Sequence, residues 1–512
     1  LPLYRAPILD WALSGQTGVR FNRDDAFRRI SRSFHAVKDS EYAPPVSLQK
    51  TLRKYQRDGY RWLRTLDGYG MGGILADDMG LGKTVQVLSY LLAMKQNGQT
   101  LPSLIVCPAS LVLNWAEECQ KFTPELSCVV VDGDAAHRAE LAESWPAADL
   151  VVTSYDLLRR DEALYEGQEF YACILDEAQA IKNHTTQKYK AVCKVRSRVR
   201  FALTGTPVEN RLGELWSIFS FLMPGYLPPY KSFCSRFEKP IVQEEDQTAV
   251  RRLNQLTGPF ILRRMKSDVL KELPPKTENV YRIELEEEQR KLYLAAVVDA
   301  REKLQAAKPE DKMAVFAVLM RLREICCDPR LIADNWEGGS AKLDACVELV
   351  SSAVEGGHRI LLFSQFTSML ELLAKRLDAE GISHFTLQGS TPKPVRAELV
   401  RRFNGGEVSV FLISLRAGGT GLNLTAADIV IHYDPWWNVA AQNQATDRAY
   451  RIGQQNPVQV YKLIAQDTIE EKIVELQQAK QSLADTVTGT ADGAILSMRP
   501  DELLQLLEGS EP

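Results

Sequence analysis

The feature that most constrains the fold is a glycine-rich segment that ends in Gly-Lys-Thr at residues 82–84. It follows a short apolar run over residues 73–76 and precedes a helix-like run that extends to Lys95. Glycines allow backbone N–H groups to approach phosphate oxygens, and the dipole of the following helix favours negative charge at its N-terminus. The segment therefore predicts a parallel α/β sheet that carries a phosphate-binding loop.

The loop reads DDMGLGKT over residues 77–84, so Asp77 occupies the first glycine position of the strict pattern G-x-x-x-x-G-K-[ST]. We expect Lys83 to reach the β- and γ-phosphates of ATP, and the hydroxyl of Thr84 to hold Mg²⁺. The alternative is a glycine-rich turn that only caps a helix. The residues assigned to the nucleotide are Asp77, Met79, Gly80, Leu81, Gly82, Lys83 and Thr84.

Two carboxylates, Asp176 and Glu177, follow a second apolar run over residues 173–175. A parallel sheet would place them at its carboxyl edge, beside the phosphate loop. There Asp176 suits the coordination shell of Mg²⁺, and Glu177 suits a base that orients and deprotonates water. An Asp-Glu pair alone is more often the start of a solvated helix, but together with the loop it predicts an enzyme that hydrolyses ATP with Mg²⁺.

The 512 residues are too many for one hydrophobic core, and two to four domains are expected at about 100–200 residues each. Apolar runs alternate with helical patterns before residue 213 and again after about residue 340, which is typical of parallel α/β sheets. Ile469, Ile473 and Leu476 form an apolar stripe that we expect to pack back on the second of these regions. The predicted parts are a lead-in segment 1–45, a first lobe 46–213, a helical insertion 214–338, a second lobe 339–480 and a C-terminal brace or tail 481–512.

The composition excludes several classes of protein. Lys and Arg number 62 against 66 Asp and Glu, so any nucleic acid must bind a local groove rather than a basic chain. No apolar stretch approaches the ~18 residues of a membrane span, so we expect no membrane partner. The nine cysteines form no Cys-x-x-Cys pair, which argues against a zinc site or a disulfide framework. The chain begins with Leu1, and we interpret it as a piece of a longer protein.

Further motifs complete a pattern that runs from about Leu52 to Gln454. They are LRKYQRDG at 52–59, LTGTP at 203–207, FSQF at 363–366, SLRAGGTGLN at 414–423, DPWWN at 434–438 and QATDRAYRIGQ at 444–454. With the two motifs above, and in this order, the chain resembles the Swi/Snf family of DNA-translocating ATPases in helicase superfamily two. The stretches LRRMKSDV at 262–269 and LPPK at 273–276 resemble a segment particular to this family, which ordinary strand-separating helicases lack.

The resemblance implies two RecA-like parallel-sheet lobes with a helical insertion between them, and an ATP site that is complete only when the lobes close. Gln56 would recognise adenine, and Arg448 and Arg451 would act as arginine fingers on the transferring phosphoryl group. At a spacing of i, i+4 and i+7, Gln444, Arg448 and Arg451 are expected on one face of a helix. Gly421 is also expected to belong to the nucleotide-binding site. Coupling between hydrolysis and lobe movement is assigned to Gln179, Thr204, Thr206 and Gln444.

Contacts with DNA are also implied by the resemblance. Arg416 and the glycines that follow it offer a cation and N–H groups to a backbone phosphate, although a simple strand-to-helix loop is the alternative. Trp437 would stack on bases or pack in the core. The basic stretch 262–276 either follows DNA or forms a solvated helical face. The assigned residues are Ser110, Asn114, Trp115, Ser154, Gln365, Arg416, Gly418, Gly419 and Trp437.

The expected function is that of an ATP-dependent translocase on double-stranded DNA, which remodels or displaces protein–DNA complexes without separating the strands. The alternatives are a strand-separating DNA or RNA helicase, an ATPase whose main client is a protein complex such as RNA polymerase, and a non-catalytic interaction module. The lack of a recognisable targeting module favours a prokaryotic member. We expect a monomer, in the cytoplasm with the nucleoid if prokaryotic and in the nucleus if eukaryotic.

Overall fold

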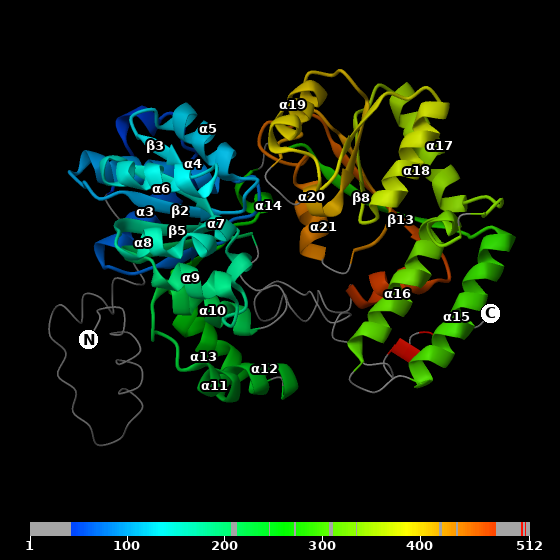
Figure 1. The fold of residues 1–512 in the computed structure, drawn as a ribbon, viewed down its shortest axis with the longest axis horizontal. Helices are drawn as coiled ribbons and strands as arrows, with labels where there is room; N and C mark the ends of the chain where they lie inside the picture. Colours follow the sequence, from blue (N-terminus) through cyan, green and yellow to red (C-terminus); the bar gives the residue numbers. More distant parts are fainter. Residues whose placement is uncertain are drawn as a thin grey trace. The chain divides into compact units, whose positions relative to one another are not determined.

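The computed structural model describes residues 42–205, 212–244, 246–270, 273–306, 311–333, 335–418, 422–436, 439–477, 503, 504 and 507. The chain divides into two compact units, Leu1–Lys271 and Glu272–Pro512, and each contains one parallel sheet (Figure 1). This confirms the predicted α/β class with two parallel-sheet lobes. None of the helices in the described ranges is long and apolar enough to cross a membrane.

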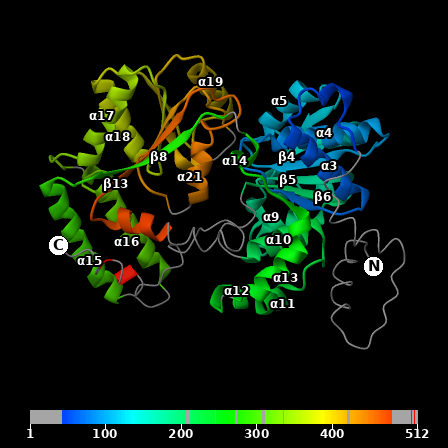
Figure 2. The same cartoon turned by 180° about the vertical axis from the view of Figure 1, so that it is seen from behind.

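A seven-stranded sheet forms the centre of the first unit. Its strands are β1 Gly73–Leu75, β2 Ser103–Cys107, β3 Cys128–Val130, β4 Leu150–Ser154, β5 Glu169–Asp176, β6 Arg196–Leu203 and β7 Ile261–Leu262. They lie in the order β3-β4-β2-β5-β6-β1-β7, and every neighbouring pair is parallel. Figure 2 labels three of these strands, β4, β5 and β6. Strands β2 and β4 are buried along their whole length, as expected for a parallel sheet that is covered on both faces.

Helices connect the strands of the first unit. They are α3 Lys54–Gly68, α4 Lys83–Gln96, α5 Val112–Phe122, α6 Ala135–Ser144, α7 Tyr155–Arg160, α8 Glu162–Glu166, α9 Gln187–Lys194, α10 Leu212–Leu222, α11 Tyr230–Phe233, α12 Lys239–Gln243, α13 Gln247–Thr257 and α14 Lys266–Val269. Side-chain oxygens of Asp134, Ser154 and Thr186 cap α6, α7 and α9, because each accepts a bond from the backbone N–H three residues on. Helix α3 packs beside α4, which follows the phosphate loop.

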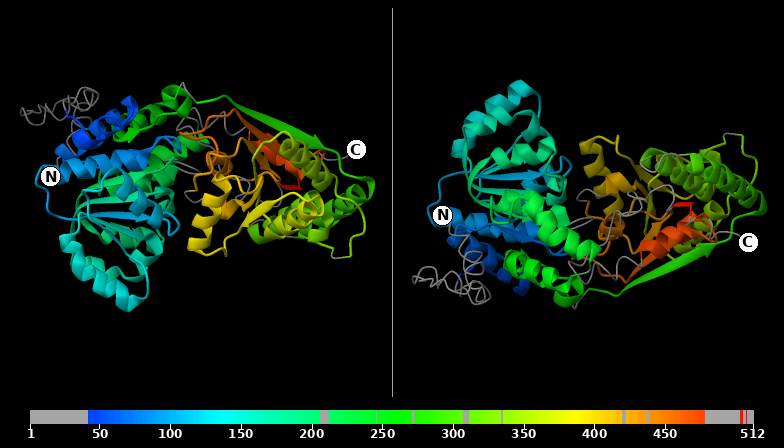
Figure 3. Two further views of the ribbon diagram at one scale, coloured as in Figure 1. Left: turned by 90° about the horizontal axis from the view of Figure 1, so that it is seen from above. Right: turned by 90° about the horizontal axis from the view of Figure 1, so that it is seen from below.

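A six-stranded parallel sheet forms the centre of the second unit. Its strands are β8 Lys276–Ile283, β9 Ile360–Ser364, β10 His384–Leu387, β11 Val410–Ser414, β12 Ile429–His432 and β13 Val458–Ala465. They lie in the order β10-β11-β9-β12-β13-β8. Strand β8 forms one edge, and Figure 3 shows it as the long green arrow beside β13. The helices are α15 Glu287–Ala306, α16 Lys312–Cys327, α17 Ala341–Glu355, α18 Thr367–Ala379, α19 Lys393–Asn404, α20 Leu415–Gly418 and α21 Val439–Thr446.

The second sheet has a hydrophobic core on each face. Because successive side chains of a strand point to opposite faces, Ile360 and Leu362 of β9 join one cluster, whereas Leu361 and Phe363 join another. Helices α17 and α18 pack in the first cluster, and α19 and α21 contribute to the second. A third cluster lies between α15 and α16 and also receives Ile469. The apolar stripe after the second lobe is therefore confirmed as a brace within its own unit.

The segment predicted as one helical insertion, 214–338, is divided between the two units. Helices α10 to α14 and strand β7 lie in the first unit, and β8, α15 and α16 lie in the second. The helical periodicity of the segment does not indicate β8, because nearly all side chains of this edge strand are exposed and carry no apolar alternation. The predicted domain boundaries themselves remain predictions.

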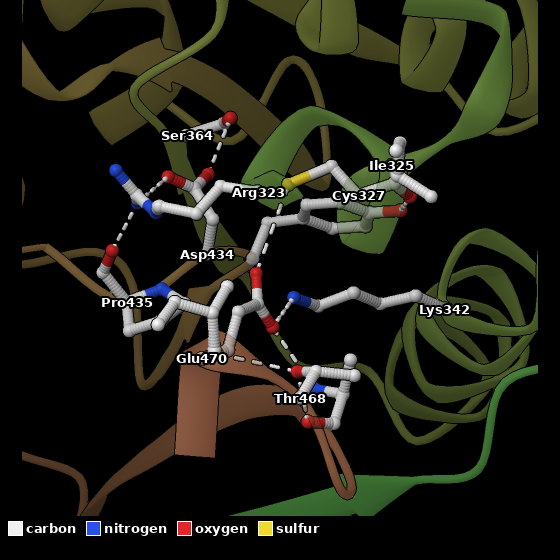
Figure 4. Close-up of polar contacts among 12 residues, drawn as sticks. Arg323, Ile325, Cys327, Lys342, Ser364, Asp434, Pro435, Thr468 and Glu470 are labelled. Carbon is white, nitrogen blue, oxygen red and sulfur yellow. Dashed lines mark hydrogen bonds and ion pairs between the residues drawn. The ribbon is translucent and has the colours of Figure 1, made fainter. Parts of the chain in front are cut away.

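Two buried ion pairs join α16 and α17 to the segments that follow β12 and β13 (Figure 4). Lys342 of α17 and Glu470 are both fully buried, and Lys342 Nζ lies 2.5 Å from Glu470 Oε2. Arg323 of α16 lies 3.3 Å from Asp434, which also accepts a 2.6 Å bond from Ser364 Oγ. Because a buried charge is costly without its partner, these pairs specify how the two helices pack on the sheet.

Replacing Glu470 with glutamine leaves the buried ammonium of Lys342 without a counter-charge. We expect the free energy of unfolding of the second unit to fall by about 3–5 kcal/mol, measured by urea denaturation. The double variant Lys342→Met/Glu470→Leu removes both charges and should recover most of this loss. As a control, Lys291→Met removes an exposed ion pair with Glu287 and should leave the midpoint unchanged. Equal midpoints for Glu470→Gln and the control would contradict the prediction.

Candidate nucleotide-binding site

The phosphate loop has the predicted surroundings, because β1 ends at Leu75 and α4 begins at Lys83. Gly82 is the N-cap of α4 with φ 75°, and Gly80 has φ 85°; both values lie in the left-handed region that side chains rarely adopt. The Lys83 ammonium donates a 2.6 Å bond to the backbone carbonyl of Asp77, so this side chain lies over its own loop.

The segment that contains Gln56 is bound to the phosphate loop. Gln56 Nε2 and the Tyr55 hydroxyl both donate to the carbonyl of Leu81, at 3.1 Å and 3.0 Å. Gln56 Oε1 accepts a 2.9 Å bond from the backbone N–H of Arg53. Burial raises the pKa of Tyr55 to about 12, so its hydroxyl stays protonated and can donate at neutral pH. The adenine contact of Gln56 remains a prediction; the structure shows this side chain as a link between α3 and the loop.

Asp176 lies at the carboxyl end of β5 and receives two hydrogen bonds. Trp115 Nε1 donates to its Oδ2 at 2.9 Å, and the backbone N–H of Glu177 donates to its Oδ1 at 2.9 Å. Burial and the negative charge of Glu177 raise the pKa of Asp176 to about 7, against the lowering effects of the Trp115 bond and the Lys83 charge. This carboxylate therefore titrates near neutral pH, which is typical of a functional site.

Glu177 is held by a chain of side-chain hydrogen bonds. Gln179 Nε2 donates to Glu177 Oε2 at 2.8 Å, and Thr204 Oγ1 donates to Gln179 Oε1 at 3.0 Å. The backbone N–H of Thr204 in turn donates to the carbonyl of Leu75 at 3.3 Å, at the end of β1. Glu177 has φ 50°, an uncommon conformation for a residue with a side chain, and such strain clusters at functional sites. Two residues predicted for coupling, Gln179 and Thr204, thus lie together beside the predicted base.

Two of the residues predicted to contact DNA are buried in the first unit. Trp115 is 1% exposed and its indole N–H is bound to Asp176. Ser154 is 3% exposed and its hydroxyl caps α7 by accepting a 3.2 Å bond from Leu157 N. Both side chains therefore have structural partners inside the unit, and their contact with DNA remains a prediction. Ser110 and Asn114 are half-buried and remain predictions.

Residues outside the predicted set also contact the loop. Asp77 is fully buried, and its carboxylate accepts bonds from Arg264 Nε at 2.7 Å and from Gln86 Nε2 at 3.1 Å. Gln86 carries no local sequence signal of this role. For Arg264, the signal was the family-specific stretch 262–269, whose place in the fold the sequence did not reveal.

The prediction that Gln444, Arg448 and Arg451 share one helical face is wrong. Helix α21 ends at Thr446 and a turn follows it. There the carbonyl of Arg448 accepts a 3.0 Å bond from the backbone N–H of Leu424, a partner outside the helix. This contact with a neighbouring segment competes with continuation of the helix, so the periodicity of the sequence extends further than the helix itself.

The two arginines differ in exposure. Arg448 is 2% exposed, whereas Arg451 is half-buried and donates from Nη1 to the carbonyl of Leu422 at 3.3 Å. Gln444 is half-buried on α21. The roles of these residues toward a nucleotide remain predictions.

The remaining predicted residues of the second unit concern DNA or the nucleotide. Gln365 donates its backbone N–H to Asp434 at 3.2 Å, just after β9. Arg416 and Gly418 lie in α20. Thr206, Gly419, Gly421 and Trp437, together with the side chain of Arg416, lie outside the described residues.

Comparison with known proteins identifies the family. Residues 55–331 match the SNF2-related domain, and residues 341–453 match the helicase conserved C-terminal domain. The chain is 40% identical over 463 residues to the uncharacterized ATP-dependent helicase MG018 of Mycoplasma genitalium, covering 89% of this chain and 44% of that protein. It is 39% identical to YwqA of Bacillus subtilis, a protein named for ATP-dependent helicase/translocase activity, over 96% of this chain and 55% of that protein. It is also 34% identical to the TATA-binding protein-associated factor MOT1 of Saccharomyces cerevisiae, over 94% of this chain and 30% of that protein.

The chain thus spans about half the length of the bacterial relatives it matches. A solved structure, the Sulfolobus solfataricus SWI2/SNF2 ATPase core in complex with dsDNA, is 36% identical and aligns over 88% of this chain and 96% of that one, with a TM-score of 0.45. Because the SNF2-related match covers more than half of the 512 residues and a helicase C-terminal domain follows it, the chain belongs to the SNF2-related family.

Proposed function

We propose that this chain hydrolyses ATP and uses the reaction to translocate on double-stranded DNA, displacing proteins bound to it. The observation that carries the proposal is the network Glu177–Gln179–Thr204 beside the phosphate loop, in one unit. A glycine-rich turn that only capped a helix would have no need of a base held in this way. Membership of the SNF2-related family supports the same conclusion.

The loop residues would bind the phosphates of ATP. Backbone N–H groups at the start of α4 face an anion with the positive end of the helix dipole, and Lys83 adds a full charge. The ammonium of Lys83 now donates to the carbonyl of Asp77 and would exchange this acceptor for phosphate oxygens. Phosphate binding therefore needs only a side-chain movement in this loop.

Oxygen donors suited to Mg²⁺ lie in the same unit, on Thr84 and Asp176. Among the described residues, no group of three or more His, Cys, Asp or Glu could hold a metal. This fits Mg²⁺, which is commonly bound by one or two protein ligands together with substrate phosphates and water. When bound, the ion would neutralise charge on the phosphates, and its own charge would keep Asp176 ionised.

Glu177 would orient the attacking water and accept its proton. The Gln179 amide donates to one of its carboxylate oxygens, which gives the carboxylate a fixed orientation. Thr204, which follows β6, donates to Gln179. It therefore belongs to the series of hydrogen bonds that positions the base. We propose that Arg448 and Arg451 of the second unit complete the site, because a planar guanidinium suits the spread charge of the phosphoryl group.

The proposal of a DNA track and a protein client draws on the relatives. YwqA is named for helicase and translocase activity, and MOT1 is named as a factor associated with the TATA-binding protein. A relative whose partner is a DNA-binding protein favours displacement of protein from DNA. Contacts to backbone phosphates would make binding weakly dependent on sequence and strongly dependent on salt.

Steady-state ATP hydrolysis with no nucleic acid, single-stranded DNA, double-stranded DNA or RNA tests this function. We expect strong stimulation by double-stranded DNA alone. Glu177→Gln should lower kcat by roughly 10²–10⁴-fold, because it removes the base. Stimulation by single strands or RNA would favour a strand-separating helicase. Hydrolysis that survives Glu177→Gln would contradict the assignment of the base.

The pH dependence of hydrolysis tests the surroundings of Asp176. At limiting Mg²⁺, kcat/KM should rise with pH as Asp176 ionises, since only the carboxylate holds the ion. The Trp115 bond lowers the pKa of Asp176, so Trp115→Phe should move the midpoint to higher pH. Trp145, a second buried tryptophan whose indole N–H has no hydrogen-bond partner, provides the control Trp145→Phe with an unchanged midpoint. A midpoint for Trp115→Phe at or below the wild-type value would contradict the expected role of Trp115.

A further inference from the structure

The first part of the basic stretch, residues 262–266, runs beside the phosphate loop. Leu262 pairs with Leu75 where β7 lies parallel to β1, and its carbonyl accepts a 2.7 Å bond from Ala76 N. The pairing continues into the loop, because Asp78 N donates to the carbonyl of Arg264 at 3.0 Å. The Asp78 carboxylate in turn accepts a 2.9 Å bond from Lys266 N. Residues 76–78 are therefore hydrogen-bonded to the backbone of the segment from Leu262 to Lys266.

The side chain of Arg264 binds the first residue of the loop. Its Nε donates to Asp77 Oδ1 at 2.7 Å, and its Nη2 donates to Oδ2 of the same carboxylate, in a bidentate arrangement. Nη2 also donates to Gln86 Oε1 at 2.8 Å, and Nη1 donates to the carbonyl of Tyr55. Arg264 thus joins the start of the loop, helix α4 and helix α3.

Helix α3 approaches this cluster closely at Gly59, where a side chain would displace the ends of Gln86 and Arg264. A Cβ at position 59 would lie 1.8 Å from Gln86 Oε1 and 2.8 Å from Arg264 Nη2. The same helix brings Tyr55 and Gln56 to the carbonyl of Leu81 near the other end of the loop. The loop is therefore held at its start by Arg264 and near its end by α3.

We propose that Arg264 is a positioning residue for nucleotide binding, which acts on the phosphate loop through the buried carboxylate of Asp77. This inference rests on the proposed function. It explains together two features of the sequence that appear unrelated, the aspartate at the first glycine position of the loop and the family-specific stretch 262–269. A buried carboxylate needs a buried cation, and Arg264 supplies it from a position 187 residues downstream.

The same segment begins the covalent connection between the two units. The second unit starts at Glu272, six residues after Lys266, a reach of at most about 20 Å for an extended chain. A change in the path of this connection would therefore act on the segment that holds Asp77 and Asp78. Arg264 is in this way placed to make nucleotide affinity depend on the connecting segment.

A double-mutant cycle on the whole chain tests the proposal, with the affinity for a fluorescent ATP analogue and Mg²⁺ as the readout. Arg264→Gln and Asp77→Asn should each weaken binding by about tenfold, a factor that corresponds to 1.4 kcal/mol. The double variant should bind the analogue no more weakly than the single variant with the lower affinity, because both changes break the same interaction. Arg264→Lys keeps the charge without the planar fork and should restore part of the affinity.

The pair Arg138–Asp161 is a matched control in the same unit. It is also a buried bidentate pair, with distances of 2.6 Å and 2.8 Å, and it lies on α6 and before α8, outside the nucleotide site. Arg138→Gln should lower thermal stability and leave nucleotide affinity unchanged. If it weakens binding as much as Arg264→Gln, or if the cycle is additive, the positioning role is overturned.

Two of these variants and one further variant keep the outcome decisive. If Arg264→Gln does not fold, Arg264→Lys and Asp77→Asn still test the interaction between the two side chains. Wild-type affinity for the analogue in both variants would overturn the proposal. Lys83→Ala should abolish binding of the analogue at the phosphate loop. A wild-type chain that does not bind the analogue at all would instead mean that the proposed function has failed, not the role of Arg264.

Discussion

The buried ion pair between Asp77 and Arg264 is the interaction on which the candidate site depends. Asp77 is fully buried, so its charge is tolerable only because a guanidinium binds both of its oxygens. The first residue of the phosphate loop is therefore bound by a segment that returns, through β7, to the edge of the first sheet.

The chemistry of the site follows from the order of strands in the first sheet. Strands β1, β6 and β5 are neighbours, and all are parallel, so the residues that follow them meet at one edge. The loop follows β1, Thr204 follows β6, and Asp176 ends β5. The chain from Glu177 through Gln179 to Thr204 crosses this edge from β5 to β6 and ends on the carbonyl of Leu75. The residue proposed as the base for hydrolysis and a residue proposed to couple hydrolysis to lobe movement are thus joined by side-chain contacts.

Much of this arrangement was predictable from local sequence. The phosphate loop, the carboxylates after β5 and the alternation of strands and helices carry strong local signals, because glycines, charged residues and apolar periodicity have local causes. Strand β8 was not predictable, since an edge strand with exposed side chains has no hydrophobic pattern. The end of α21 was missed because Arg448 is bonded to a segment outside the helix. The contacts of Trp115 and Arg264 were also not predictable, because each side chain binds a carboxylate that is distant in sequence.

The central claim is that the phosphate loop and the stretch from Leu262 to Lys266 behave as one structural element. Hydrogen exchange of the whole chain, with and without Mg²⁺ and a non-hydrolysable ATP analogue, tests it directly. The account predicts that nucleotide slows exchange at residues 77–84 and at residues 262–266 together. Slower exchange at residues 77–84, with residues 262–266 unchanged, would contradict it.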